Sequence, residues 1–138
     1  CNLITAIKIK SARMLLAYGF LRSVFEVFER FKTPIDMITT SEVAVSLTID
    51  DTSNLDKIKK ELESFGIVEI DTDQSIVCIV GNMVSETEGA AIKIFESLKS
   101  VPVRMISYGG SRHNISVVVE AKNKQKALQA LNSGLFTF

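Results

Sequence analysis

The order of strand-like and helix-like segments is the feature that most constrains how this chain can fold. Strand-like stretches alternate apolar and polar residues or concentrate β-branched residues, and helix-like stretches repeat apolar residues every three or four positions. Residues 3–71 give the order β-α-β-β-α-β, and the same order begins again at residue 75. After Gly134 only four residues remain, too few for a fourth strand. We therefore predict an α+β protein with two βαββαβ domains, residues 1–73 and 74–138, the second lacking one strand.

Several local features are expected within this order. An apolar stripe predicts the buried face of the first helix, formed by Leu21, Val24, Phe25, Phe28 and Phe31. Ser53 and Asp56 have capping-box spacing at the start of the second helix. Residues 67–71 and 75–80 are expected as two strands, Cys78 as a buried thiol in the second of them, and Gly134 as the end of the last helix. The letters repeat as well, since Met37-Ile38 matches Met105-Ile106.

A hairpin is predicted over residues 35–50, with a polar tip formed by Thr39, Thr40, Ser41 and Glu42. Asp36 has the same strand parity as Glu42, so both carboxylates can point to one face if the strand is regular. Such a rim would suit a small zwitterion that carries an extra positive charge. From these residues alone, a solvated hairpin tip is the simpler interpretation.

Composition excludes several functional classes. Sixteen basic and sixteen acidic residues cancel, so the chain has no basic field for nucleic acid or an anionic membrane. No uncharged run is longer than residues 74–85, which are fewer than the roughly 20 residues of a membrane span. Two cysteines give neither a disulfide framework nor a metal site. We expect a soluble, cytoplasmic protein, and a start at Cys1 in place of Met indicates a fragment of something longer.

The sequence predicts no catalytic residues. His113 is the single histidine and lies in a predicted loop, so a turn residue is the simpler interpretation. Gly109-Gly110-Ser111 lacks the spacing and the lysine of a nucleotide-binding loop. A small ferredoxin-like enzyme such as an acylphosphatase stays open as an alternative, although no convincing arginine–asparagine pair is present to cradle a phosphate.

Several stretches together resemble the C-terminal regulatory region of aspartate kinases, and most closely the lysine-sensitive, monofunctional type. The resemblance covers nearly the whole chain, and the run Ile38-Thr39-Thr40-Ser41-Glu42-Val43 is a specific match. The other matching stretches are Gly19-Phe20-Leu21, residues 105–111, His113-Asn114 and Leu135-Phe136.

The resemblance implies two tandem ferredoxin-like ACT domains, small modules that bind amino acids and report to a catalytic domain. It implies a parent aspartate kinase that uses ATP and Mg²⁺, with its kinase domain upstream of this chain, and feedback inhibition by L-lysine in the biosynthesis of lysine, threonine and methionine. The fragment itself would hold no cofactor and no metal. It would form a homodimer through its ACT domains, with the first domain binding the effector and the second stabilising the dimer.

By position, the resemblance implies an effector site in the first ACT domain, against the same domain of a second subunit. Its residues would be Met14, Gly19, Phe20, Leu21, Asp36, Thr40, Ser41 and Glu42. Backbone N–H groups at the helix start would hold the α-carboxylate. Glu42 would receive the ε-ammonium and Asp36 the α-amino group, as charge-assisted hydrogen bonds.

The chain departs from the resemblance at Ala17-Tyr18, where lysine-type members often carry a small hydroxyl and a basic or imidazole residue. In the second copy, Arg104 and Tyr108 replace the acid and hydroxyl pattern, so lysine binding is not expected there. The second ACT domain of the family borrows a strand from a segment just before the first domain, which would explain the missing strand. A threonine-sensing region of a bifunctional aspartate kinase–homoserine dehydrogenase is the remaining alternative, and the Glu42 carboxylate argues against it.

Overall fold

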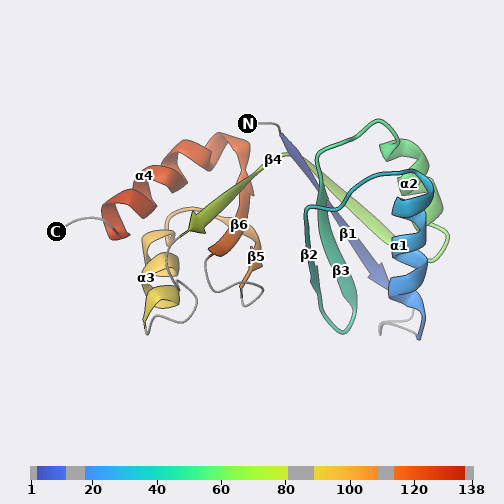
Figure 1. The fold of residues 1–138 in the computed structure, drawn as a ribbon, viewed down its shortest axis with the longest axis horizontal. Helices are drawn as coiled ribbons and strands as arrows, with labels where there is room; N and C mark the ends of the chain where they lie inside the picture. Colours follow the sequence, from blue (N-terminus) through green and yellow to red (C-terminus); the bar gives the residue numbers. More distant parts are fainter. Residues whose placement is uncertain (1–2, 12–17, 81–88, 109–113, 136–138) are drawn as a thin grey trace. The chain divides into compact units, whose positions relative to one another are not determined.

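The computed structural model describes residues 3–11, 18–80, 89–108 and 114–135. Within it the chain divides into two compact units, Cys1–Thr72 and Asp73–Phe138. Each unit places two helices on one face of an antiparallel sheet, which is the α+β, ferredoxin-like arrangement that the order of segments predicts (Figure 1).

The first unit has the strand order β2-β3-β1-β4. Its elements are β1 (Ile4–Ser11), α1 (Phe20–Arg30), β2 (Met37–Thr40), β3 (Ala44–Ile49), α2 (Leu55–Leu62) and the first part of β4 (Gly66–Val80). β3 pairs antiparallel with both β1 and β2, so that Ser46 lies opposite Lys8 on one side and Thr39 on the other. Because side chains alternate along a strand, these three residues share one face of the sheet.

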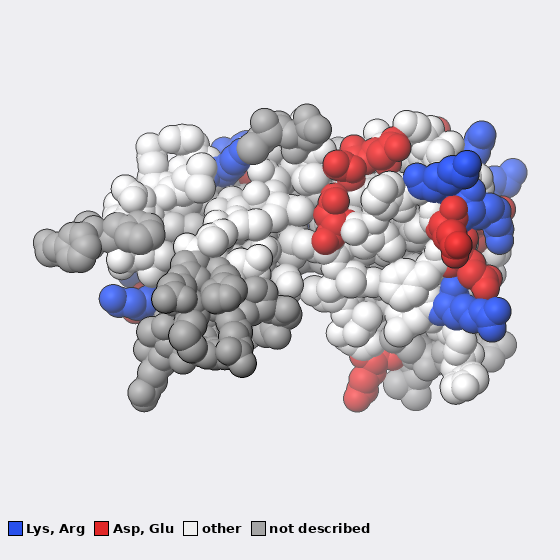
Figure 2. Space-filling view, in the orientation of Figure 1, with Lys and Arg blue, Asp and Glu red and all other residues white. Residues whose placement is uncertain are grey.

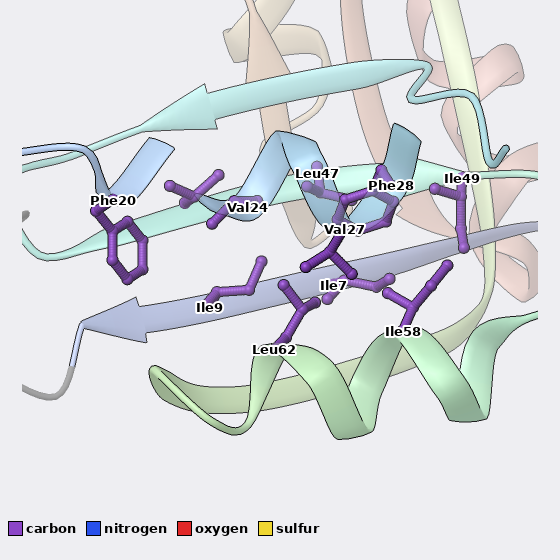
Figure 3. Close-up of a cluster of buried hydrophobic side chains, with 11 residues drawn as sticks. Ile7, Ile9, Phe20, Val24, Val27, Phe28, Leu47, Ile49, Ile58 and Leu62 are labelled. Atoms are coloured by element: carbon purple, nitrogen blue, oxygen red, sulfur yellow. The ribbon is translucent and has the colours of Figure 1, made fainter. Parts of the chain in front are cut away.

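The core of the first unit lies between the opposite face of the sheet and the two helices (Figure 3). β1 and β3 contribute β-branched and leucine side chains that are almost fully buried, and α2 contributes two more. The cluster contains Ile7, Ile9, Phe20, Val24, Val27, Phe28, Val45, Leu47, Ile49, Ile58 and Leu62. A continuous apolar face of this kind supplies most of the stability of short helices and strands.

The face that α1 buries differs from the predicted one. Val24 and Phe28 are buried as expected, but Leu21 is 37% exposed and Phe25 is 42% exposed. Phe20 and Val27 take their places in the core. The helix is apolar on two adjoining faces, so the spacing alone could not decide which of them meets the sheet.

The two helices of the first unit are fixed to each other at their ends. The Arg30 guanidinium donates to Glu61 at 2.7 Å, and the Asn54 side chain donates to the Phe31 carbonyl at 3.1 Å. The predicted capping box does not form at the start of α2, where Asn54 occupies the cap position without a side-chain cap bond. Ser53 instead donates from its backbone and its hydroxyl to Asp51, which lowers the pKa of Asp51.

The two strands predicted over residues 67–71 and 75–80 are one element, β4, which runs from Gly66 to Val80. Its first part belongs to the first unit, and residues 74–80 pair with β6 (Asn114–Glu120) in the second. Asp73, at the division between the units, has a positive φ of 56°. Backbone pairing on both sides of this position holds the strand together, and sequence periodicity could not show that continuity.

The second unit has the strand order β4-β6-β5, with β5 spanning Val103–Ser107. The 3-10 turn η1 (Ala121–Asn123) leads into α4 (Lys124–Leu135), which contacts α3 (Ala90–Ser97). Gly134 was predicted to end the last helix, but it lies inside α4, which ends at Leu135. Cys78 was expected to be buried and is exposed, because Val77 and Ile79 take the core face of β4.

Within the described residues, the second unit has three strands where the first has four. In the first unit, β4 lies beside β1, at the sheet edge away from β2. The corresponding position in the second unit is the side of residues 74–80 that faces away from β6. This agrees with the prediction that the second copy is one strand short.

Candidate functional site

Four segments of the first unit lie at one end of its sheet: the end of β1, the starts of β3 and β4, and the start of α1. The end of β1 adjoins the start of β3, since the Ser11 N–H donates to the Val43 carbonyl at 2.8 Å. The start of β4 lies against the same end, because a Cβ at Gly66 would be 2.8 Å from the Lys10 carbonyl oxygen. Phe20, the first residue of α1, contacts Phe65 edge-to-face at 5.8 Å between ring centroids. The N-terminus of α1 and the β2–β3 turn therefore belong to the same end of the sheet (Figure 3).

The N-terminus of α1 has no side-chain cap. Gly19 occupies the cap position with φ 87°, a left-handed conformation that glycine adopts without steric cost. Its carbonyl accepts from the backbone and the hydroxyl of Ser23 at 3.1 and 3.2 Å. Among the described residues, no side-chain oxygen thus accepts from the first N–H groups of the helix, and such an end attracts anionic groups.

The β2–β3 turn is closed by Ser41. Its backbone N–H donates to the Ala44 carbonyl at 2.9 Å, and its hydroxyl accepts from the N–H groups of Ala44 and Val43 at 3.2 and 3.4 Å. The hydroxyl is therefore engaged in the hairpin itself, a role that the sequence did not predict. Glu42, the next residue, is exposed and makes no ion pair in the part of the chain that the structure describes.

Asp36 lies at the other end of β2. Its N–H donates to the Thr48 carbonyl at 2.8 Å, just before the strand begins at Met37. Partial burial, followed by repulsion from Asp50, raises the pKa of Asp36 above its usual value. A nearby cation would remove this cost, because an opposite charge favours the ionised carboxylate.

The predicted effector residues are thus divided between two places. Gly19, Phe20 and Leu21 lie at the same end of the sheet as Thr40, Ser41 and Glu42, and Asp36 lies at the opposite end of β2. Met14 falls outside the described residues, as does His113. Arg104 lies half-buried in β5 next to a register shift, in the second unit.

One feature near this end was missed by sequence reasoning. Lys8 and Lys10 of β1 line a hollow with a volume of about 270 Å³ on the sheet face away from the helices. The alternation Ile7-Lys8-Ile9-Lys10 predicted the two faces of the strand, but only the register with β2 and β3 shows what lies beside the lysines.

The described residues show neither a metal centre nor a membrane-spanning helix. Within the described ranges, no group of three or more His, Cys, Asp and Glu side chains could hold a metal ion. No helix among these residues is long and apolar enough to cross a membrane. On the face seen in Figure 2, basic and acidic side chains are interspersed over the helical side of the first unit.

Comparisons with known proteins give a consistent result. Residues 77–135 match the ACT domain family. The chain is 34% identical to the lysine-sensitive aspartokinase 3 of Escherichia coli K12, over 96% of this chain and 31% of that protein. A solved C-terminal regulatory domain of aspartate kinase from Porphyromonas gingivalis W83 is 50% identical with a TM-score of 0.88, covering 99% of this chain and 94% of that one.

A second solved structure, E. coli aspartokinase III in complex with lysine and aspartate, is 33% identical with a TM-score of 0.84 and covers 99% of this chain and 32% of that one. The chain spans about a quarter to a third of the length of the curated relatives that it matches. Sequence, fold and domain organisation therefore agree that the chain belongs to the aspartate kinase family, as an ACT-domain regulatory region.

Proposed function

We propose that this chain is the feedback-sensing part of a longer aspartate kinase and that its first unit binds L-lysine. The observation that carries the proposal is that the α1 N-terminus, which has no side-chain cap, lies at the same end of the sheet as the β2–β3 turn. The turn carries Glu42, which has no ion-pair partner among the described residues. Phosphorylation of aspartate with ATP and Mg²⁺ would belong to a kinase domain outside this chain. Among relatives, the E. coli enzyme is named as lysine-sensitive and was solved with lysine.

The chemistry of this end suits an amino acid with a second ammonium group. Backbone N–H groups at the start of α1 can bind the α-carboxylate, as helix N-termini commonly do. Glu42 can accept the ε-ammonium in a charge-assisted hydrogen bond. Phe20 is 8% exposed, so only a small part of its ring can contact the aliphatic stem of lysine.

Within one chain, Asp36 cannot contact the same lysine molecule as Ser41 and Glu42. Five residues of extended backbone separate it from Ser41, which corresponds to roughly 16 Å. β2 is an edge strand of the first unit's sheet, and Asp36 precedes it while Ser41 and Glu42 follow it. Two β2 strands placed antiparallel about a two-fold axis would bring Asp36 of one copy towards the turn of the other.

An exposed apolar surface supports such a dimer. Leu21 and Phe25 of α1 are partly exposed, and Ile38 of β2 is 36% exposed. Burying these side chains against a second copy would be favourable, at about 25 cal/mol for each Å² of apolar surface removed from water. Lysine held between two copies would then favour the dimer by mass action.

The experiment that tests the proposal is calorimetric titration with lysine, threonine and methionine, together with sedimentation with and without lysine. Glu42→Gln keeps the shape of the side chain and removes its charge, so lysine binding should weaken by about 1.5–3 kcal/mol, or about 10- to 150-fold. Glu69→Gln changes the same charge on an exposed residue of β4 and should leave binding unchanged.

Three results would contradict parts of the proposal separately. Equal lysine affinity in Glu42→Gln and the parent chain would remove Glu42 from the site. Preference for threonine over lysine would assign a different effector. A monomer–dimer balance that lysine does not change would exclude a site shared between two copies.

A further inference from the structure

The hollow beside β1 is lined by residues of one chemical character. Among the described residues, two lysines and four hydroxyl-bearing residues form its walls, with two small apolar side chains and no carboxylate. The lining consists of Lys8, Lys10, Thr39, Thr40, Ser41, Val43, Ala44 and Ser46. Its volume of about 270 Å³ is just below the range of pockets that hold drug-sized ligands, so a smaller ligand suits it.

Strand register places the polar groups in one row. Lys8 lies opposite Ser46, and Ser46 lies opposite Thr39, so an ammonium and two hydroxyls follow each other across three strands. Lys10 stands two residues further along the same face, opposite Ala44. Ala44 is small, so its side chain fills little of the space beside Lys10.

These groups have no competing partners in the described part of the chain. In the residues that the structure describes, neither lysine makes an ion pair, and the hydroxyls of Thr39, Thr40 and Ser46 make no hydrogen bond. Arg22, Arg30 and Lys122, by contrast, are each paired with a glutamate within 3.2 Å. Residues two apart on a strand are separated by roughly 6.6 Å, so the two ammonium groups repel each other until an anion lies between them.

We propose that this hollow is a binding site for a small anion with several oxygen atoms and more than one negative charge, either a phosphate or a short dicarboxylate. The two ammonium groups would bind its charge, and the hydroxyls of Ser46 and Thr39 would donate to its oxygens. The hollow borders the proposed lysine site, because Thr40 and Ser41 of its lining are also predicted effector residues, but neither Glu42 nor the start of α1, which would bind the charged groups of lysine, lines it. The inference therefore does not rest on the proposed function.

Another hollow of the first unit provides an internal control. It lies on the helical side and contains two lysines as well, Lys57 and Lys60, but Glu61 and Ser64 share its lining with Phe31. Glu61 is paired with Arg30 and places a carboxylate beside the lysines. An anion that simply followed lysine charge would bind both hollows, whereas the proposal expects it in the hollow beside β1.

The test is a titration of the whole 138-residue chain with inorganic phosphate, with malonate and with sodium chloride at matched ionic strength, at a pH where phosphate is mainly dianionic. Calorimetry gives the affinity, and backbone amide NMR shifts locate the site. Saturable binding of phosphate or malonate, with shifts confined to residues 8–11 and 39–46, is the expected result. Phosphate alone would indicate a tetrahedral anion, and malonate alone a dicarboxylate.

Variants then distinguish a specific anion-binding site from a general attraction of anions to lysine charge. Lys8→Gln and Lys10→Gln should each weaken binding by roughly tenfold or more, and Ser46→Ala by roughly two- to tenfold. The double variant Lys57→Gln/Lys60→Gln carries the same charge change as the two lysine variants combined and should bind as the parent chain does. Equal weakening in that control, or no saturable binding of either anion beyond the chloride titration, would overturn the proposal.

Discussion

Gly134 of α4 approaches Ser97 of α3 so closely that a Cβ at position 134 would overlap the Ser97 hydroxyl oxygen and lie 2.8 Å from the Ser97 Cβ. The Ser97 hydroxyl donates to the Lys93 carbonyl at 2.7 Å, so it cannot turn away without losing that bond. The glycine therefore sets how closely the two helices of the second unit approach each other.

Gly134→Ala should destabilise the second unit. Alanine gains about 1 kcal/mol of helix propensity over glycine, but forcing a methyl group into the α3–α4 contact costs about 1–3 kcal/mol. We expect the free energy of unfolding to fall by about 1 kcal/mol in urea denaturation, with the second unit affected first. Combining it with Ser97→Ala, which removes the overlapping oxygen, should recover part of the loss. A more stable Gly134→Ala variant would contradict the close approach.

Lys32 is predicted to be a site of conformational strain. It follows α1 with a φ of 50°, its N–H donates to the Glu29 carbonyl at 3.0 Å, and the Thr33 N–H donates to the Phe28 carbonyl at 2.9 Å. These two bonds form a Schellman motif, in which the left-handed position usually holds glycine. Lys32→Gly should raise the free energy of unfolding by about 1 kcal/mol, measured by urea denaturation.

The matched control for this strain is Lys59→Gly. Lys59 is exposed inside α2, where glycine has no strain to relieve, so the same change should cost about 1 kcal/mol there. Opposite signs for the two variants would establish the strain at position 32. A loss of stability in both would show that the Lys32 backbone is not strained.

The stability of the first unit should depend on the charge of Asp36. Its pKa is raised in the folded state by burial and by Asp50, so the ionised carboxylate costs stability at neutral pH. Below the usual value of 3.8 the carboxyl is protonated in both states and the cost disappears. Asp36→Asn should therefore raise the melting temperature at pH 7, and the gain should shrink as the pH falls through the raised pKa.

A second variant identifies the source of this cost. Asp50→Asn removes the repelling charge, so the pKa of Asp36 should move down towards its usual value, as measured by NMR titration of its side chain. Because burial is the larger cause, part of the upward shift should remain. An unchanged Asp36 pKa would show that the Asp50 charge does not reach it.

Ser41 should matter to folding as well as to any ligand. Its hydroxyl accepts from the Ala44 and Val43 N–H groups within the hairpin turn, so Ser41→Ala should lower the free energy of unfolding by about 1 kcal/mol. Thr40→Ala removes a hydroxyl that makes no hydrogen bond among the described residues and should leave stability almost unchanged. Urea denaturation of both variants, without ligand, tests this. Equal effects would mean that the turn does not depend on the Ser41 hydroxyl.

The repeat in the sequence determined a large part of the fold. Met37 and Met105 are 8% and 5% exposed, and the isoleucines that follow them, Ile38 and Ile106, are 36% and 42% exposed. The matching letters thus occupy matching positions in the first edge strand of each unit's hairpin. Local patterns succeed here because strand alternation and helix periodicity follow from backbone geometry, which each segment carries by itself.

Tertiary structure decided what those patterns left open. Periodicity allowed two faces of α1, and contact with the sheet selected the one with Phe20 and Val27. Residues 66–80 join into one strand because they pair with neighbours from both units, which no local signal records.

The same holds for the candidate site. Asp36 and Glu42 share a strand parity in the sequence, but the length of β2 separates them, and the register of three strands brings Lys8, Ser46 and Thr39 into one row. Sequence determined which chemical groups the chain carries and which elements hold them. Their neighbours depend on long-range pairing, because residues far apart in sequence become adjacent only when the sheet forms.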